Sequence, residues 1–320
     1  MHRRQLLGFS LAMLGAVSAG GLTWRNFSAA MTQAHARTQG RSRTFQSRFG
    51  VTEYAEAGSG PPVLMIHGTG GGFDQGLDFA QPLAARWRII APSRFGYLRS
   101  SLPDDPSSER QADAFVDLLD ELGINRAPII GGSAGALSAM QFAIRHPNRC
   151  SALVAMVPAA YAPGRPPVEP PNPIAQAIID YALKSDFLFW LGLSLNEDAM
   201  IAALLATDPA LVKAASPAEQ ARVRAILRNI LPVSARAQGF LNDAQLAYDP
   251  APMPIEMIRA PTLALSLEDD RFQTLAAARH IANTVPNAEL AAFPTGGHVW
   301  VGREREVFRS VDAFLSRHAR

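Results

Sequence analysis

The chain has 320 residues, of which 48% are hydrophobic and 18% are charged, and its formal net charge is +2. This composition is that of a globular protein and excludes a largely disordered chain. The small net charge, without a long run of Lys or Arg, excludes the electrostatic footprint of a nucleic-acid-binding protein. The single cysteine, Cys150, cannot form an internal disulfide and is expected to be a small buried residue.

The N-terminal segment, residues 1–24, has the pattern of an export signal. Arg3 and Arg4 precede a stretch without charged side chains, which resembles a twin-arginine signal, and residues 17–19 form a candidate small-residue cleavage site. This interpretation places the protein outside the cytoplasmic membrane, in the periplasm or the medium. The alternatives are an incidental basic start and an uncleaved anchor, because the uncharged stretch approaches the roughly 20 residues that span a bilayer. Residues 25–43, rich in Ser, Thr, Gln and Arg, are predicted to be a linker.

Strand and helix patterns alternate in the rest of the chain. Strands are predicted at residues 45–48, 51–57, 62–66, 88–91, 127–130, 152–157, 261–266 and 288–293, and helices at 75–86, 108–122, 136–146, 273–284 and 303–317. Continuous apolar strands that alternate with helices predict an α/β fold with a mostly parallel sheet covered by helices on both faces. Ligands of such sheets bind at the carboxyl ends of the strands.

Prolines interrupt this alternation. They are dense from Pro158 to Pro173 and again from Pro250 to Pro254, and the stretch between these clusters has a helical pattern. We therefore expect residues 159–254 to form a helical cap on a core made of residues 44–158 and 255–320.

The sequence Gly131-Gly132-Ser133-Ala134-Gly135 lies between a predicted strand and a predicted helix. A serine flanked by glycines in this context predicts a nucleophile elbow, in which a sharp turn exposes the serine hydroxyl above the sheet.

A serine nucleophile needs a base, and the base needs an acid that orients it. His298 follows the last strand on a glycine-rich loop and is the predicted base, whereas His67 is expected to hold its own loop. The acids Glu268, Asp269 and Asp270 follow the preceding strand, and only one of them is needed as the partner of His298.

The oxyanion of the reaction needs backbone N–H donors. Ala134, which follows the serine, is one candidate, and the loop after strand 62–66 supplies Thr69, with Gly70 as the alternative. The glycine run 70–72 allows close approach to a substrate, and it lacks the Gly-Lys-Ser/Thr of a phosphate-binding loop.

Together these motifs resemble the α/β-hydrolase superfamily over residues 45–318. The resemblance rests on His67-Gly68, on Gly96 and Ser100, on the elbow around Ser133, on Asp270 and on His298. It implies an α/β-hydrolase fold with Ser133 as nucleophile, Asp270 as acid, His298 as base and Thr69 and Ala134 as oxyanion donors. The chain departs from the family pattern in having Thr274 where a proline is usual, so Asp269 stays an alternative to Asp270. It also has Ser93 and Leu98 where the family usually has Asp and a second Gly near Gly96.

The predicted function is a cofactor-independent serine hydrolase that cleaves a small, apolar ester or related acyl substrate. Alternatives on the same triad are C–C bond hydrolysis and perhydrolase or haloperoxidase-like activity; a non-catalytic binding protein is the third class. Neither a cofactor nor a metal is expected, because no cluster of residues has metal-ligand spacing. We assign substrate contacts to Gly70, to Trp300 and to Phe189 and Trp190 of the apolar run 187–191, although such runs also pack a cap onto its core.

Overall fold

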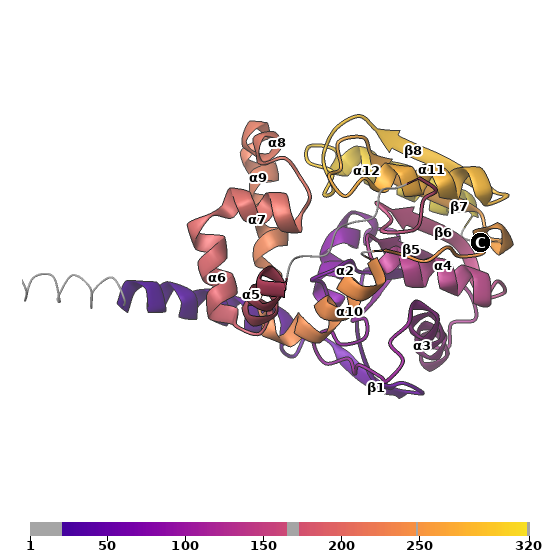
Figure 1. The fold of residues 1–320 in the computed structure, drawn as a ribbon. Coiled ribbons are helices and arrows are strands. Elements are labelled where there is room, and N and C mark those ends of the chain that lie inside the picture. The colour runs from indigo at the N-terminus through magenta and orange to yellow at the C-terminus, as the bar shows by residue number, and fades with distance from the viewer. Residues whose placement is uncertain (1–20, 165–172, 248, 319–320) are drawn as a thin grey trace, which may run out of the picture.

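The computed structural model describes residues 21–164, 173–247 and 249–318, and an eight-stranded sheet forms the centre of this described part (Figure 1). The strands are β1 (Arg43–Ser47), β2 (Gly50–Ala57), β3 (Pro62–Ile66), β4 (Arg88–Pro92), β5 (Ala127–Gly132), β6 (Cys150–Met156), β7 (Thr262–Leu267) and β8 (Ala288–Phe293). Their order in the sheet is β1-β2-β4-β3-β5-β6-β7-β8. The pairs β1–β2 and β2–β4 are antiparallel, and all other pairs are parallel.

Helices cover both faces of the sheet. The helices α3 (Ser108–Glu121), α4 (Gly135–Arg145) and α11 (Thr274–Thr284) pack on one face, and α2 (Phe73–Ala80) and α12 (Glu304–His318) pack on the other. Strands β3, β5, β6 and β7 are buried on both faces, which explains their continuous apolar sequences. The predicted α/β architecture is therefore confirmed.

The helix expected at residues 75–86 is shorter than the sequence pattern suggested. α2 ends at Ala80, and a 3₁₀ turn, η1 (Gln81–Leu83), follows it. Pro82 lies in this turn, and its missing N–H prevents the α-helix from continuing.

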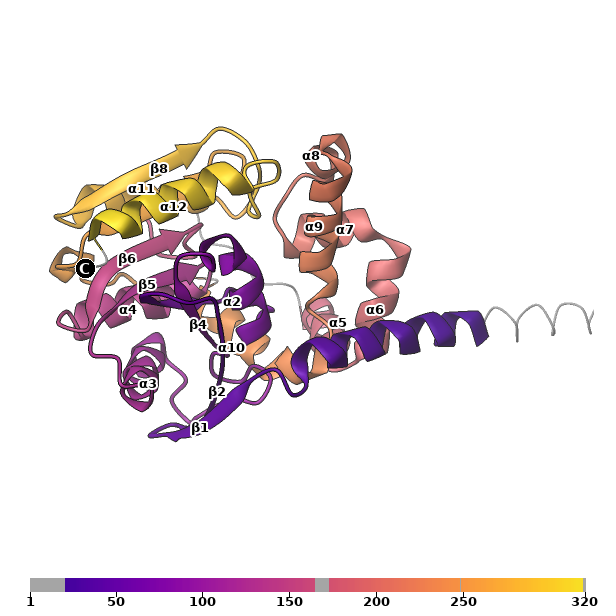
Figure 2. The ribbon, with the colours of Figure 1, turned by 180° about the vertical axis from the view of Figure 1, so that it is seen from behind.

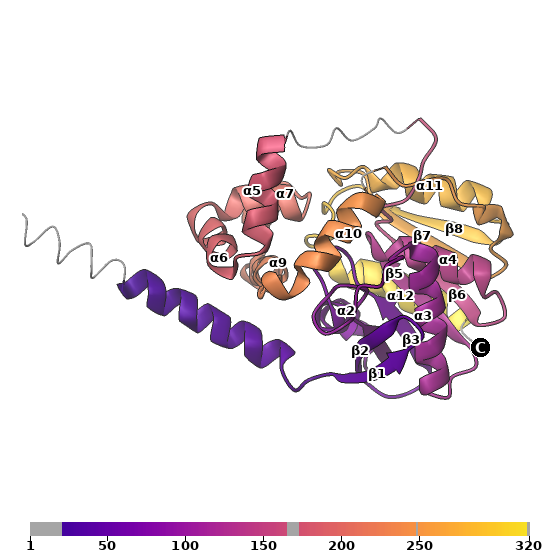
Figure 3. The same ribbon diagram turned by 60° about the horizontal axis from the view of Figure 1, so that its bottom comes forward.

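A helical insertion follows β6. Its helices are α5 (Pro173–Leu183), α6 (Asp186–Leu195), α7 (Glu197–Leu204), α8 (Pro209–Ala214), α9 (Pro217–Arg228) and α10 (Ala237–Ala247), with the 3₁₀ turn η2 (Ser234–Arg236) before α10. Figure 1 and Figure 2 show α5 to α9 grouped beside the sheet, and Figure 3 shows α10 returning from this group to the core. We call this insertion the cap. It has an apolar core of its own, which includes Phe189, Ile201 and Leu227.

The expectation of a linker at residues 25–43 is corrected by the structure, since residues 21–38 form a helix. This N-terminal helix, indigo in Figure 2, packs on the cap: the ring centroid of Phe27 lies 5.3 Å from that of Phe187 and 5.6 Å from that of Trp190. Ala34, two turns further along, is buried in the cap core. The expected export segment lies outside the described residues, except for positions 21–24, which belong to this helix.

Buried charges join the cap to the core. The guanidinium of Arg94, in the loop after β4, donates hydrogen bonds of 2.6 and 2.5 Å to the two carboxylate oxygens of Asp243 on α10. The hydroxyl of Tyr97 donates a further hydrogen bond of 2.6 Å to the same carboxylate. These side chains are almost completely excluded from solvent. Each charge therefore depends on its partner, because an unpaired buried charge is strongly destabilising.

Replacing Asp243 by Ala should accordingly lower the stability of the protein by about 3–5 kcal/mol, since it leaves the Arg94 guanidinium buried and unpaired. Chemical denaturation followed by tryptophan fluorescence measures the change. The matched control is Asp198→Ala, which removes an exposed carboxylate paired with Lys213 and should cost at most about 1 kcal/mol. Equal losses in the two variants would contradict this account of the cap–core junction.

Candidate active site

Ser133 lies at the turn between β5 and α4, with the left-handed backbone conformation of a nucleophile elbow (φ 51°). The glycines at positions 131 and 135, on either side of Ser133, are required because no Cβ atom fits there. A Cβ atom at Gly135 would lie 2.4 Å from the His67 carbonyl oxygen, and one at Gly131 would lie 2.6 Å from the Ala139 Cβ. Any side chain at either position would push α4 away from the sheet. The strained serine conformation therefore persists because the close packing around it allows no other.

The structure brings Ser133, His298 and Asp270 together at the carboxyl ends of β5, β8 and β7. The His298 Nε2 atom lies 3.0 Å from the Ser133 Oγ, and its Nδ1 atom lies 2.8 Å from the Asp270 Oδ2. With the imidazole neutral, Nδ1–H donates to the carboxylate and Nε2 accepts from the serine hydroxyl. His298 and Asp270 are buried, whereas Ser133 is half-buried and reachable from solvent.

The environment of Asp270 keeps its carboxylate ionised. Its oxygens accept hydrogen bonds from the Phe272 N–H, at 2.9 Å, and from the Thr274 hydroxyl. Burial by itself would raise the pKa of Asp270, but its interactions with His298 and these hydrogen bonds outweigh burial and lower that pKa. Thr274, which stands where the family usually has proline, thus orients the acid.

Asp269, the alternative acid, has a different set of contacts. Its carboxylate oxygens accept hydrogen bonds of 3.0 and 2.8 Å from the backbone N–H groups of Gly296 and Gly297. Asp269 therefore holds the loop that carries His298, whereas Asp270 contacts the imidazole itself. This geometry favours Asp270 as the acid.

The loop after β3, residues 67–72, lies against the elbow, where a Cβ atom at Gly68 would be 3.1 Å from the Ser133 Cβ. The Gly70 N–H donates to the Tyr97 hydroxyl at 3.2 Å, so it is already occupied. Within the described part of the chain, the N–H groups of Thr69 and Ala134 have no protein acceptor. Those two donors are therefore available to a bound oxyanion.

His67 fixes the start of this loop. It is fully buried, and its Nδ1 atom lies 2.7 Å from the Gly68 carbonyl oxygen. Its Nε2 atom accepts a hydrogen bond of 2.9 Å from the backbone N–H of Arg94. Burial, followed by the positive charge of Arg94, lowers the pKa of His67 well below its usual value. A neutral imidazole with both ring nitrogens engaged acts as a structural link and has no free nitrogen for proton transfer.

Two further residues contact His298 and were not identified from the sequence. The hydroxyl oxygen of Thr207, in the cap after α7, accepts a hydrogen bond of 3.1 Å from the backbone N–H of His298. The half-exposed Phe272 packs edge-on to the imidazole, with ring centroids 4.9 Å apart. Phe272 follows the predicted acid by two residues, and this position was a usable signal for its contact with His298. For Thr207 the sequence offers none, because only the folded cap brings it to this loop.

The residues expected to contact substrate lie in three different places. Trp300 is buried in the core, packed against Phe79 and Phe308, and Phe189 is buried inside the cap. Trp190 contacts the N-terminal helix through Phe27. In this structure all three side chains make packing contacts, and their contact with substrate stays a prediction. Gly70 does lie in the loop beside Ser133.

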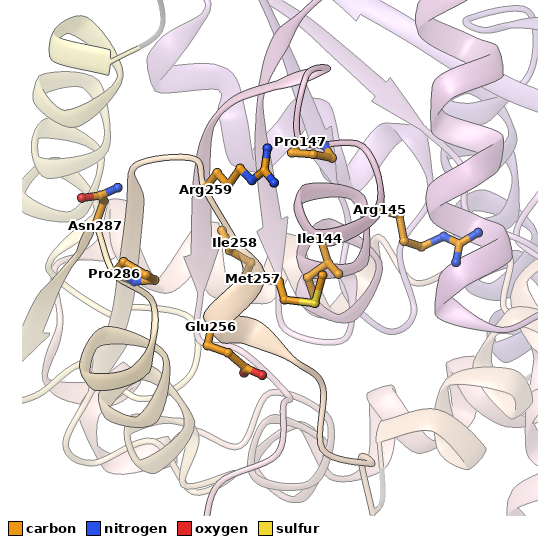
Figure 4. A pocket seen from close by; sticks show the side chains of 9 residues that line it. All are labelled: Ile144, Arg145, Pro147, Glu256, Met257, Ile258, Arg259, Pro286 and Asn287. Atoms are coloured by element: carbon orange, nitrogen blue, oxygen red, sulfur yellow. The ribbon is translucent and has the colours of Figure 1, made fainter.

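A surface cavity of about 470 Å³ lies away from the triad (Figure 4). Residues at the end of α4, around the 3₁₀ turn η3 (Ile255–Met257) and before β8 line it, among them Arg145, Met257 and Pro286. These segments precede strands β6, β7 and β8, so the cavity is at the edge of the sheet opposite Ser133. The cavity is therefore separate from the candidate active site.

Within residues 21–164, 173–247 and 249–318, no three His, Cys, Asp or Glu side chains gather as a metal site would require. No single helix there is both long and apolar enough to cross a membrane, although the bent pair α6 and α7 reaches the required length and hydropathy together.

A serine on a tight elbow, with a histidine and an acid at the carboxyl ends of neighbouring parallel strands, defines a hydrolase of the α/β class. The family model for the alpha/beta hydrolase fold matches residues 61–300. The chain belongs to this family.

Individual relatives agree with this assignment. A 2-hydroxy-6-oxononadienedioate/2-hydroxy-6-oxononatrienedioate hydrolase of Paraburkholderia xenovorans is 31% identical over 271 residues, which cover 82% of this chain and 90% of the relative. An alpha/beta hydrolase fold protein from Nakamurella multipartita superposes with a TM-score of 0.68 at 25% identity, covering 86% of this chain and 98% of that one. A bacterial membrane phospholipase A shares the fold over 98% of both chains, with a TM-score of 0.64 and 24% identity.

Exchanging each aspartate for asparagine tests the geometry around His298. Asp270→Asn should lower kcat by about 10⁴ while the fold persists, because the imidazole then adopts the wrong tautomer. Asp269→Asn should have a mild effect, since an amide oxygen can still accept from the Gly296 or Gly297 N–H. Steady-state kinetics with circular dichroism as the folding control measure both variants. A larger loss in Asp269→Asn would assign the acid to Asp269 instead.

Proposed function

We propose that this protein is a cofactor-independent serine hydrolase that cleaves an ester or a related acyl compound through an acyl-enzyme. The observation that carries the proposal is the unbroken chain of contacts from the Ser133 Oγ through His298 to Asp270, beside the unpaired N–H groups of Thr69 and Ala134. A binding protein would need a pocket but no such ordered set of groups.

In the first half of the reaction, His298 Nε2 takes the proton of the Ser133 hydroxyl as the Oγ attacks the carbonyl carbon. The carbonyl oxygen becomes an oxyanion and accepts hydrogen bonds from the Thr69 and Ala134 N–H groups. The ionised Asp270 stabilises the imidazolium. When the tetrahedral intermediate collapses, His298 gives its proton to the leaving alkoxide, which departs as an alcohol, and the acyl group remains on Ser133.

The second half repeats the same proton transfers with water. His298 removes a proton from a water molecule as its oxygen attacks the acyl carbon, and the same two N–H groups stabilise the second oxyanion. Collapse returns the proton to the Ser133 Oγ and releases the carboxylic acid. Every step uses groups of this chain and water.

The acyl group that fits this site is small and apolar. Phe240 and Ile230 of the cap are the side chains nearest to a Cβ atom built at Gly70. Apolar cap residues therefore lie directly over residues 67–72, which we call the oxyanion loop. Phe272 adds a ring beside His298. A cap packed this closely should limit acyl chain length.

This proposal predicts that a fluorophosphonate probe labels the wild-type protein. It also predicts hydrolysis of short-chain p-nitrophenyl esters, from the acetate to the hexanoate, without added metal or nucleotide. Rates should fall for long acyl chains, and a chelator should have no effect. Ser133→Ala should abolish labelling and lower kcat by about 10⁶. Mass spectrometry of the labelled peptide and initial-rate assays provide the measurements. Labelling that persists in Ser133→Ala would refute the assignment of the nucleophile.

A second candidate is hydrolysis of a C–C bond on the same triad. It is favoured by the 31% identical relative from Paraburkholderia xenovorans, which is named a 2-hydroxy-6-oxononadienedioate/2-hydroxy-6-oxononatrienedioate hydrolase. A wild-type protein that is probe-reactive at Ser133 but inactive on all activated esters would favour this function. A protein that neither labels nor turns over would favour a ligand-binding role.

We further propose that residues 1–24 direct export of the protein, either as a cleaved signal or as an uncleaved anchor. The support is the pair Arg3 and Arg4 before an uncharged stretch. A cut after Ala19 would leave the N-terminal helix, residues 21–38, intact on the cap.

Expression in a bacterium with a twin-arginine pathway should therefore place the protein outside the cytoplasm, and Arg3→Lys combined with Arg4→Lys should retain it inside. Cell fractionation and N-terminal mass spectrometry measure the outcome: a shortened N-terminus identifies a signal, and an intact one in the membrane fraction identifies an anchor. An intact N-terminus on a cytoplasmic wild-type protein would contradict the export proposal.

A further inference from the structure

Arg37, near the end of the N-terminal helix, connects this helix to both the cap and the core. Its guanidinium donates hydrogen bonds of 2.6 and 2.5 Å to the side chain and carbonyl oxygens of Asn229 and one of 2.9 Å to the Leu231 carbonyl oxygen. Its Nε donates at 3.0 Å to the carboxylate of Asp74, at the start of α2. The side chain of Arg37 is 19% exposed, so these contacts are largely shielded from water.

Asp74 links Arg37, through Arg236, to the loop that carries Thr69. Its carboxylate oxygens also accept hydrogen bonds of 3.0 and 2.7 Å from Arg236 in η2, which is fully buried. The same guanidinium donates to the Gly71 carbonyl oxygen. Gly71 is two residues after Thr69, so a continuous series of charged hydrogen bonds leads from Arg37 to the backbone that presents the Thr69 N–H.

The charges of this cluster explain why Arg37 matters to it. Asp74 and Asp78 are the carboxylates, and Arg236 and Arg37 are the cations, with Asp78 held by the Asn229 amide at 3.0 Å. Burial would raise the pKa of Asp74, but Arg236 and Arg37 together outweigh burial and lower that pKa. Asp78 is exposed, whereas Asp74 is buried, so without Arg37 the buried carboxylate would have Arg236 as its one hydrogen-bonded cation.

We propose that Arg37 is a positioning residue for acyl transfer, because its contact with Asp74 sets the place of Arg236, of the Gly71 carbonyl and hence of the Thr69 N–H. This inference rests on the proposed serine hydrolase function. The family match covers residues 61–300, so Arg37 lies outside it and the N-terminal helix adds this support to the shared core. A helix that precedes the hydrolase core is thereby part of its catalytic support.

The alternative is that Arg37 only packs the helix onto the cap. The aromatic contacts of the same helix provide the comparison, since Phe27 touches Phe187 and Trp190 of α6 and contacts neither Asp74 nor the oxyanion loop. A packing role predicts the same effects from losing Phe27 and losing Arg37. A positioning role predicts a kinetic effect from Arg37 alone.

The test compares full-length Arg37→Ala with Phe27→Ala and with Arg25→Ala, which removes an exposed arginine of the same helix. For Arg37→Ala we expect kcat on p-nitrophenyl acetate to fall about tenfold, with KM within about twofold, because displacement of an oxyanion donor weakens transition-state binding more than substrate binding. The rate constant of fluorophosphonate labelling at Ser133 should fall by a similar factor. Arg37→Lys, which keeps the charge beside Asp74, should recover part of the loss.

Phe27→Ala should lower the melting temperature and leave kcat unchanged, and Arg25→Ala should change neither. If Arg37→Ala does not fold, Arg37→Gln, which keeps a donor but loses the charge, takes its place with the same expected fall in kcat. An unchanged kcat in the folded variant, a rise in KM alone, or an equal loss of kcat in Phe27→Ala would overturn the inference. Failure of the proposed function is a separate result, in which the wild type itself neither labels at Ser133 nor hydrolyses the ester.

Discussion

The site depends on the close approach of two backbones, the start of α4 and the end of β3. The position of a Gly135 Cβ would be 2.4 Å from the His67 carbonyl oxygen and 2.7 Å from that of Ile66. Only glycine permits this contact, and the contact places the oxyanion loop beside Ser133. Pairing of Ile66 with Gly131 in the parallel β3–β5 ladder fixes the register of the two segments. Ser133 and the loop that carries the Thr69 N–H are thus adjacent because of main-chain packing, before any side chain contributes.

Buried charge pairs then determine how the cap sits on this edge. Arg94 with Asp243 and Arg236 with Asp74 each join a core residue to a cap residue. Replacing such pairs with apolar side chains is often neutral or stabilising in other proteins, so a buried ion pair is weak evidence for stabilisation. What these pairs determine here is the position of the residues that they join. The Tyr97 hydroxyl joins Asp243 to the Gly70 N–H, and Arg236 binds the Gly71 carbonyl, so each pair also anchors the oxyanion loop.

Much of the sheet and of the site could be predicted from the sequence, because parallel strands bring their carboxyl ends to one edge. Ser133, Asp270 and His298 each follow a buried strand, and their convergence needed only that rule. The N-terminal helix was missed because its Ser, Thr and Gln content suggested a linker. Its buried or partly buried residues, Phe27, Met31, Ala34 and Thr38, nevertheless recur at helical spacing.

Other positions could not be read from local sequence at all. Trp300 follows the catalytic loop, yet its indole turns into the core against Phe308. Thr207 reaches the His298 N–H only because the cap folds back over the sheet. In both cases the direction of a side chain depends on packing between segments that are far apart in the chain.

The cap is held to the core at both of its ends. The end formed by η2 and α10 carries the two buried ion pairs. At the other end Val299 and Val301, which follow His298, pack into the apolar core of the cap. Hydrogen bonds add to this contact: the Val299 carbonyl oxygen accepts from Arg222 at 2.7 Å, and the Glu219 carboxylate accepts from the Gly302 N–H at 2.9 Å. The hydroxyl oxygen of Thr207 accepts from the backbone N–H of His298 itself. The loop that carries His298 is therefore positioned by the folded cap as well as by the sheet.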